Sequence, residues 1–190
     1  MDGMKSQDIV VLLKLVSLQE DDQSSDAVPQ EPRNDDAYSV RSLEALLAIS
    51  KTEISASINR SLSSGLLGRD HESGRPKPNR RNLHNFIVHG LKFAFPAKPG
   101  AMTRGLPTAF AAPMLQGQLI SGGEYIYVWP FAEGRAIGQS VKPLFKNVPE
   151  AVQKDERLYE YLALVDAIRL GNQREANLAA ERLSERLLKK

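Results

Sequence analysis

Apolar residues recur every three or four positions along several stretches of this chain, and that spacing predicts helices with one buried face. These stretches cover residues 6–19, 51–64, 80–93, 148–170 and 173–190. Residues 124–130 instead alternate β-branched and aromatic residues, which predicts a short strand. The pattern predicts a mainly helical α+β protein with a small amount of sheet.

The helix expected over residues 51–64 has the most complete start and stop signals. Ser50 can cap it, Glu53 can reach back to the Ser50 amide, and Gly65 can end it in the left-handed conformation. The apolar stripe that must face a core consists of Ile54, Ile58 and Leu62. The opposite face carries short or hydrogen-bonding side chains, namely Thr52, Ala56, Asn59, Arg60 and Ser63. A helix with such a face can approach the base edges of DNA closely.

Residues 41–67, RSLEALLAISKTEISASINRSLSSGLL, form two short helical patterns joined by a tight turn and closed by glycine. This phrase resembles the helix-turn-helix and strand entry of bacterial winged-helix transcriptional regulators of the MarR-like type, over roughly residues 6–96. The resemblance implies that the helix over residues 51–64 lies in the DNA major groove and that the following hairpin, the wing, touches the backbone. Ser61 departs from the family pattern, in which a core leucine is usual, and a small rotation could place Leu62 there instead.

The charges are distributed unevenly along the chain. The formal net charge of +2 does not by itself indicate a nucleic-acid-binding protein. Residues 60–104, however, hold nine basic residues against Asp70 and Glu72. Ser73 and Gly74 supply a turn within this basic stretch, where the wing is expected.

Residues 20–38 have the opposite character, with seven acidic residues, one basic residue and two prolines. Because almost no apolar residues are present, this segment is predicted to be a mobile acidic loop. Two interpretations are open. The loop could compete with DNA for the basic surface, or it could be a solvated linker, as most blocks of like charge are.

Asn79 can cap a helix that runs to about Phe93. Arg80 and Arg81 then fall in its first turn, where the helix dipole disfavours positive charge. A bound phosphate would relieve this, because the backbone amides and both guanidinium groups would point to one anion. The alternative is that two exposed arginines slightly destabilise the helix.

Residues 96–118 are rich in proline, glycine and small residues, so they should cross a surface without forming a helix. Their larger apolar residues should pack against the protein; these are Met102, Leu106, Phe110, Met114 and Leu115. Residues 119–120 could pair with the strand over residues 124–130 as a short hairpin. The aromatic residues that share one face of that strand are Tyr125, Tyr127 and Trp129. Such a face can stack on bases, although in sheets it more often belongs to a core or an interface.

The last third of the chain predicts a helical hairpin. Gly171 stops the helix over residues 148–170, and Asn172 with Glu175 can cap the next one. The stripe of the closing helix consists of Ala176, Ala180, Leu183 and Leu187. This stripe could form a dimer contact or simply cover its own domain. A homodimer is expected because helix-turn-helix modules usually bind two half-sites.

Catalytic and metal-binding patterns are missing from the sequence. There is no cysteine, and His71, His84 and His89 are too scattered for a metal site. No glycine-rich phosphate loop and no nucleophile elbow occur. We therefore expect neither an enzyme nor a cofactor, and no signal peptide or membrane span, which is compatible with the cytoplasm.

The sequence thus predicts a winged helix-turn-helix DNA-binding domain over residues 1–95, followed over residues 96–190 by a loop, a β-hairpin and a helical hairpin for assembly or partner binding. The expected function is sequence-specific binding of double-stranded DNA, as a transcriptional regulator. The residues expected to hold phosphates or guanine edges are Lys51 and Arg60. Those expected to read bases are Thr52, Ser55, Ala56 and Asn59. Those expected to contact the DNA backbone are Arg69, Arg75, Lys77, Arg80 and Arg81.

An alternative is a protein-interaction adaptor that uses the winged helix only as a scaffold, such as the neutralising partner of a toxin or enzyme encoded nearby. The apolar, proline-rich character of residues 96–130 suits a protein interface, to which the C-terminal helices could contribute. A ligand sensor is a further alternative, since clefts between domains commonly hold ligands, but no residue identifies a ligand.

Overall fold

The computed structural model describes residues 3–25, 36–119 and 123–189. The helices are α1 (Ser6–Ser25), α2 (Val40–Leu47), α3 (Lys51–Ser63), α4 (Arg80–His89), α5 (Leu91–Ala94), α6 (Val148–Val152), α7 (Glu156–Leu170) and α8 (Gln173–Leu187). The strands are β1 (Leu67–Arg69), β2 (Pro76–Pro78), β3 (Met102–Thr108), β4 (Tyr127–Pro130) and β5 (Ala136–Ser140). Two 3-10 turns, η1 (Ala109–Ala111) and η2 (Pro113–Leu115), follow β3. The protein is therefore a mixed α+β structure with small sheets, as predicted.

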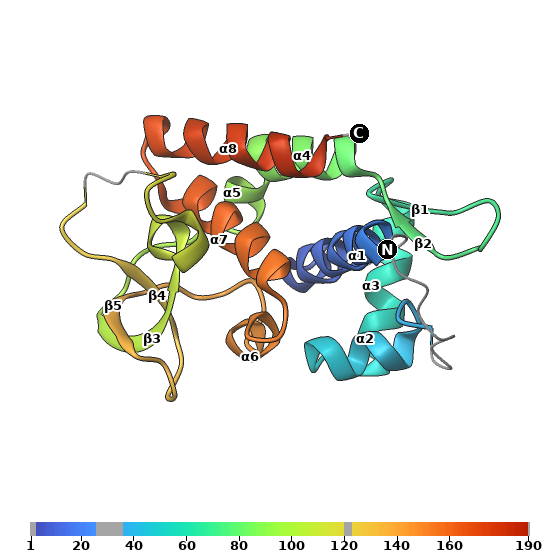
Figure 1. The fold of residues 1–190 in the computed structure, drawn as a ribbon, viewed down its shortest axis with the longest axis horizontal. Coiled ribbons are helices and arrows are strands. Elements are labelled where there is room, and N and C mark those ends of the chain that lie inside the picture. The colour runs from blue at the N-terminus through green and yellow to red at the C-terminus, as the bar shows by residue number, and fades with distance from the viewer. Residues whose placement is uncertain (1–2, 26–35, 120–122, 190) are drawn as a thin grey trace.

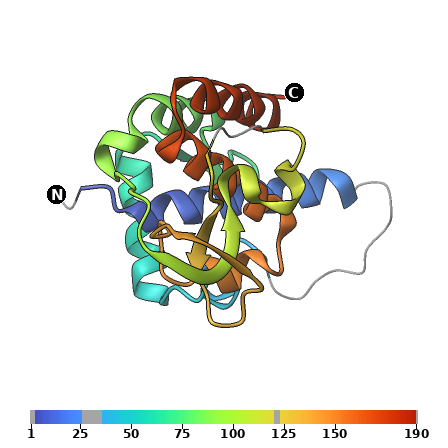
Figure 2. The same cartoon turned by 90° about the vertical axis from the view of Figure 1, so that its left-hand side faces the viewer.

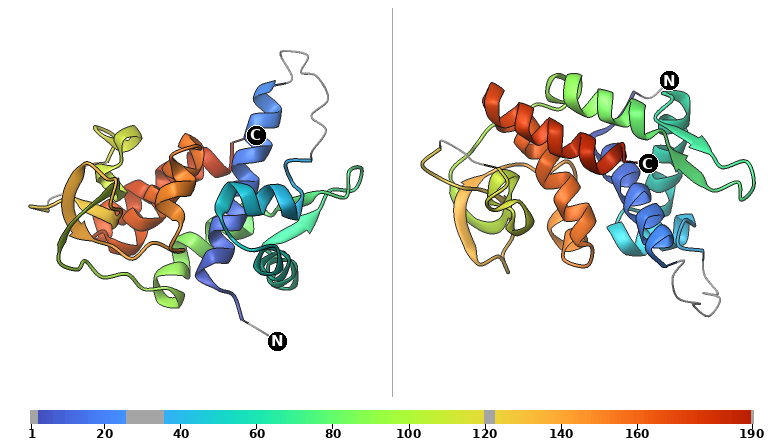
Figure 3. Two further views of the ribbon diagram at one scale, coloured as in Figure 1. Left: turned by 90° about the horizontal axis from the view of Figure 1, so that it is seen from below. Right: turned by 45° about the horizontal axis from the view of Figure 1, so that its top comes forward.

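Helix α1 lies between two regions of different construction (Figure 1). On one side are α2, α3 and the sheet β1–β2, which projects from the body; on the other are α7 and the strands β3, β4 and β5. Helices α4 and α8 lie side by side across one surface (Figure 3). Helix α1 packs against both α3 and α7. The expected domain boundary between residues 95 and 96 falls directly after α5, and one set of buried apolar side chains continues across it.

Helix α1 is longer and more buried than its apolar spacing indicates. Every residue from 8 to 18 is buried, because α3 and α7 pack against the same helix. The predicted mobile loop is wrong for residues 20–25, which form the last turns of α1. Glu20 there pairs with Arg80, and Asp21 pairs with Arg157. These acidic side chains therefore stabilise the end of the helix. Residues 26–35 of that loop lie outside the described part of the chain.

Three helix starts are confirmed by their caps. The Ser50 side chain accepts the Glu53 N–H at the start of α3, and the Asn79 side chain accepts the Asn82 N–H at the start of α4. Before α8, Asn172 and Glu175 bond each other's backbone amides reciprocally. Each contact satisfies an amide that the helix itself leaves without a partner.

Two predicted helices are each divided in the structure. The helix expected to reach about Phe93 ends at His89, and a single separate turn, α5, begins after Gly90. The helix expected over residues 148–170 is interrupted at residues 153–155. Asp155 has extended backbone there and caps α7 by accepting the Leu158 N–H. Apolar spacing alone does not reveal such breaks, because apolar residues occur on both sides of each of them.

The proline-rich segment does more than cross a surface, since it contains the strand β3. Strand β3 pairs antiparallel with β4 and with β5, and a short parallel pairing of β4 with β5 closes a small barrel (Figure 2). Gly105 and Gly138 permit this closure, because a Cβ at either position would collide with the backbone of residues 126–129. The predicted hairpin with residues 119–120 is replaced by these pairings, and residue 120 lies outside the described part of the chain.

The aromatic face of β4 belongs largely to the core. Trp129 is buried and donates from its indole nitrogen to Asp166 of α7 at 2.7 Å. Tyr125, which precedes β4, is half exposed. The core interpretation of this face therefore holds for Trp129.

The apolar stripe of α8 covers its own chain. Leu183 and Leu187 are buried in the layer that α8 forms with α4 and α7, whereas Ala176 and Ala180 are only partly buried. The C-terminal hairpin of α7 and α8 is confirmed.

Candidate nucleic-acid interface

Helix α3 turns its apolar side inward and leaves its polar side open. Ile54 and Ile58 are buried where α3 packs against α1 and α2. The exposed residues of the outer side include Lys51, Thr52, Ser55, Asn59 and Ser63, and Ala56 is partly exposed. Five of the six predicted contact residues on this helix are therefore accessible from one direction.

Arg60 is the exception, and the prediction that it contacts DNA is wrong for this structure. Its side chain is only 7% exposed and forms a two-bond ion pair with Asp8 of α1. Arg60 Nε donates to Asp8 Oδ2 at 2.9 Å and Nη2 donates to Oδ1 at 2.7 Å. Arg60 lies at the edge of the apolar stripe, so the spacing along α3 does not decide whether it is buried. Its partner Asp8 decides this, and Asp8 lies 52 residues away in the sequence.

The inner side of α3 contains two buried serines, Ser57 and Ser61. Leu62 is only partly buried, so the expected rotation that would place Leu62 at the core position does not occur. Ser61 itself occupies that position. Short side chains at 57 and 61 suit the buried side of α3, which packs against α1 and α2.

Glu53 connects α3 to the start of α1. Its carboxylate accepts a hydrogen bond from the Gln7 side chain and lies 3.4 Å from Lys5 Nζ and 3.8 Å from Arg60 Nη2. These contacts replace the expected bond to the Ser50 amide. They fix the first turn of α3 to the first turn of α1.

The sheet β1–β2 forms a hairpin beside the end of α3. Arg69 pairs with Pro76 and Gly68 with Lys77 across the two strands. The turn is ordered by Asp70, whose carboxylate accepts the Ser73 and Glu72 amides. The Ser73 backbone N–H, followed by the Ser73 hydroxyl, lowers the pKa of Asp70 to about 2. These hydrogen bonds from residues 72 and 73 to Asp70 stabilise the turn at the tip of the hairpin.

A groove of about 280 Å³ separates this hairpin from α3. Ser55 and Asn59 line it from α3, Arg69 and Pro76 from the hairpin, and Ser39 from the start of α2. Two predicted base-reading residues and one predicted backbone-gripping residue therefore face a common space. The structure brings these predicted residues together from three separate elements.

Arg75, at the far side of the hairpin, is held by the acidic residues that precede and follow residues 26–35. Its guanidinium lies 3.3 Å from Asp36 and 3.9 Å from Asp22, and it stacks over the Tyr38 ring at 4.9 Å. Tyr38 donates its hydroxyl to Asp22 at 2.7 Å, and burial together with that bond raises the pKa of Tyr38. Arg75 is still half exposed, but it would have to exchange these partners for a phosphate.

Of the two arginines in the first turn of α4, only Arg81 is exposed. Arg80 is 22% exposed and contacts Glu20 and Gln19 of α1, each at 3.3 Å. A carboxylate of the same protein thus already balances the positive charge of Arg80 at this end of the helix. This weakens the interpretation that Arg80 binds a phosphate. Sequence reasoning missed Glu20 as its partner because residues 20–38 were expected to form a loop.

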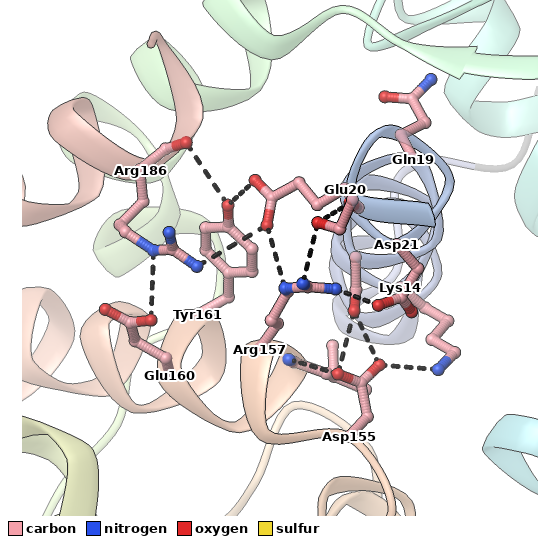
Figure 4. A network of polar contacts seen from close by, with 12 residues as sticks. Lys14, Gln19, Glu20, Asp21, Asp155, Arg157, Glu160, Tyr161 and Arg186 are labelled. Carbon is pink, nitrogen blue, oxygen red and sulfur yellow. Dashed lines mark hydrogen bonds and ion pairs between the residues drawn. The ribbon is translucent and has the colours of Figure 1, made fainter. Parts of the chain in front are cut away.

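Glu20 also joins α1 to the C-terminal helices (Figure 4). It accepts the Tyr161 hydroxyl at 2.6 Å and lies 3.6 Å from Arg186 of α8 and 3.9 Å from Arg157 of α7. Earlier in α1, the Lys14 ammonium donates to the Asp155 carboxylate at 2.6 Å (Figure 4). These pairs fix the orientation of α1, and through it α3, relative to α7 and α8.

Within the described residues, no group of three or more His, Cys, Asp or Glu side chains could hold a metal ion. No helix among those residues has the length and apolar character needed to cross a membrane. The chain was also compared with protein-family models, curated proteins and solved structures, and none of the three comparisons gives a significant match.

Proposed function

We propose that this chain binds double-stranded DNA in a sequence-specific manner, as a transcriptional regulator. In this proposal α2 and α3 are a helix-turn-helix and β1–β2 is the wing. The observation that carries the proposal is the open polar face of α3 beside a hairpin whose Arg69 and Lys77 are exposed. Short polar side chains allow a helix to enter the major groove, and flanking cations neutralise phosphates.

The proposed roles follow from accessibility. Thr52, Ser55, Ala56 and Asn59 read base edges, and Lys51 contacts a phosphate at the helix start. Arg69, Lys77 and Arg81 contact phosphates of the DNA backbone. Arg75 contacts a phosphate only after its ion pairs with Asp22 and Asp36 are broken. A homodimer would place two such surfaces on two half-sites.

Selection of bound sequences from a random DNA pool, followed by fluorescence anisotropy, tests the proposal. Asn59→Ala should weaken binding to the selected site by about 1–3 kcal/mol and spare binding to unrelated DNA, because only base contacts are lost. Asn177→Ala, an exposed asparagine on α8, is the matched control. If no sequence is enriched, or if both kinds of DNA lose affinity equally, this assignment fails.

Replacing Arg69 and Lys77 together with Gln should flatten the dependence of log affinity on log salt by about two, since each phosphate contact contributes about 0.9 to the slope. The paired control is Lys154→Gln with Arg174→Gln, which removes two exposed cations elsewhere. An unchanged slope in the hairpin variant would contradict a phosphate role for the hairpin.

A second candidate is a protein-interaction adaptor, and the barrel supplies the observation that favours it. Met102 and Ile137 are 49% and 56% exposed and belong to adjacent, paired strands, with the exposed Tyr125 and Ile126 close in sequence to β4. Exposed apolar residues on adjacent strands are typical of protein interfaces. A stable stoichiometric complex that co-purifies with the chain and is lost in Met102→Ser with Ile137→Ser, together with no retention of DNA, would favour this function.

A further inference from the structure

The outer surface of the small barrel has a covered half and an open half. On the covered half, Trp129 of β4 is buried against α7, where it donates to Asp166, and its pairing partner Leu106 of β3 packs against the core. On the open half, Met102 of β3 and Ile137 of β5 are exposed. These two large apolar side chains therefore lie on a part of the barrel that α7 does not cover.

Two arginines lie beside these apolar side chains. Arg104 is exposed and faces the same side of β3 as Met102, because alternate residues of a strand share a face. Strand pairing places Ile137 directly opposite Arg104, and such opposite residues have Cβ atoms only about 4.5–5.5 Å apart. Arg135, also exposed, directly precedes β5. We call Met102, Arg104, Arg135 and Ile137 the barrel patch.

The arginines of the barrel patch have no partner within the described part of the chain. Neither guanidinium forms a hydrogen bond or an ion pair there, whereas Arg157, Arg182 and Arg186 of α7 and α8 each pair with a carboxylate. The segment that builds the barrel and leads to α6 also has an excess of positive charge. Over residues 96–146 the basic residues are Lys98, Arg104, Arg135, Lys142 and Lys146, and the acidic residues are Glu124 and Glu133.

Aliphatic side chains beside two such guanidinium groups are complementary to a segment that carries both apolar side chains and carboxylates, because a guanidinium can form two parallel hydrogen bonds with one carboxylate. We propose that the barrel patch docks an acidic segment of a partner protein. Apolar side chains of that segment cover Met102 and Ile137, and its carboxylates pair with Arg104 and Arg135. The aliphatic character of the patch favours a protein over single-stranded RNA, whose bases stack on aromatic side chains.

The barrel patch and the open side of α3 belong to regions on opposite sides of α1 (Figure 1). Docking at the patch therefore does not require the outer side of α3. This inference rests on the second candidate function, that of a protein-interaction adaptor, and specifies the chemistry of its partner; it does not depend on DNA binding.

Selection from short random peptides displayed on phage tests the proposal. Peptides that bind Met102→Ser with Ile137→Ser are removed first, and the remainder are selected on the wild-type chain. The enriched peptides should combine Asp or Glu with apolar residues. In fluorescence anisotropy titrations, Arg104→Gln with Arg135→Gln should bind an enriched peptide at least about tenfold more weakly than the wild type does. Replacing the peptide's own Asp and Glu with Asn and Gln should weaken its binding to the wild type by a similar factor.

Matched controls remove the same kinds of side chain elsewhere. Lys154→Gln with Arg174→Gln removes two exposed cations, and Phe93→Ser removes an exposed apolar side chain. Both controls should bind the peptide as the wild type does. Because every substituted side chain is exposed, the Tm of each variant should stay close to that of the wild type.

The outcomes separate this inference from the function on which it rests. Enriched peptides without acidic residues, or an unchanged affinity in the arginine variant, would overturn the acidic partner and leave the adaptor function standing. The absence of any peptide that depends on Met102 and Ile137 would contradict both. Binding of an oligouridylate RNA in place of a peptide, lost in the arginine variant, would assign the patch to single-stranded nucleic acid and would also overturn the inference. None of these measurements contains double-stranded DNA, so none of them bears on the proposed DNA binding.

Discussion

Helices α3 and α7 are similar in length and both begin at a side-chain cap, yet the protein uses them in opposite ways. Ten of the 15 residues of α7 are buried, on all sides, because α1, α5, α6, α8 and the barrel surround it. Only five of the 13 residues of α3 are buried, and its outer side has no covering element in the described part of the chain. The difference teaches that α7 is part of the scaffold, whereas α3 presents a surface.

Each of these helices nevertheless contains one buried charge that ties it to a distant segment. Arg60 of α3 is paired with Asp8 of α1. Asp166 of α7 accepts from Trp129 and Thr108 and pairs with Arg169 at 2.9 Å. The Arg60–Asp8 pair, and the bonds that Trp129 and Thr108 donate to Asp166, are costly to form in a buried place but specify one orientation of each helix. Their disruption is costly as well.

The largest effect should come from breaking the charge pair that anchors α3. Asp8→Ala removes the carboxylate that forms two hydrogen bonds with the buried Arg60 guanidinium, so the free energy of unfolding should fall by about 3–5 kcal/mol. Urea denaturation followed by circular dichroism measures this. Asp21→Ala is the matched control on the same helix, because the exposed Asp21–Arg157 pair should contribute less than about 1 kcal/mol. Equal, small losses in both variants would show that Asp8 does not anchor α3.

A smaller, pH-dependent effect should come from the start of α7. Burial alone would raise the pKa of Asp155, but the Lys14 ammonium, the Leu158 N–H and the Ser17 hydroxyl together hold that pKa below its usual 3.8. Since the folded pKa is depressed, this stabilisation is present above pH 3.8 and is lost as the pH falls through the folded pKa. Asp155→Asn should therefore cost about 2 kcal/mol near neutral pH.

The pH dependence itself separates this charge effect from simple loss of a cap. The difference in unfolding free energy between wild type and Asp155→Asn should shrink as the pH falls below about 4. Asn remains a good cap, so the cap contact is retained. A difference that stays constant with pH would contradict the proposed pairing with Lys14.

The same comparison shows which parts of the fold the sequence could reveal. The starts of α3, α4 and α8 were predictable because Ser50, Asn79 and Asn172 bond amides within three residues of themselves. Local chemistry decides such contacts. The open face of α3 was predictable for a related reason, since the spacing of Ile54 and Ile58 defines the buried side.

Contacts between distant segments could not be predicted in this way. Arg60 lies at the edge of the α3 stripe, and only Asp8, on another helix, decides that it is buried. Strand β3 contains Gly105 and Pro107, which disfavour strands locally, and the tight closure of the barrel is what requires the glycine. The start of α1 likewise contacts the segment that leads to α6, more than 130 residues later in the chain, as the Ser6 to Leu144 bond shows.

A third and smaller effect should distinguish the cap of α3 from its exposed end. Ser50→Ala removes the acceptor of the Glu53 amide and should lower the free energy of unfolding by about 1 kcal/mol. Ser63→Ala, at the exposed last residue of α3, should change it by less than about 0.5 kcal/mol. Thermal and urea denaturation of the two variants give this difference. Equal effects would mean that the cap does not limit the stability of α3.

The smallest effect, and the one most diagnostic of an open surface, should come from Asn59. Alanine has a higher helix propensity than asparagine by roughly 0.5 kcal/mol, so Asn59→Ala should leave the free energy of unfolding unchanged or slightly raise it if this side chain has no structural contact to lose. Urea denaturation without DNA measures this directly. A loss of more than about 1 kcal/mol would instead mean that Asn59 is held within its own protein, as Arg60 is, and that α3 resembles α7 more closely than its exposure indicates.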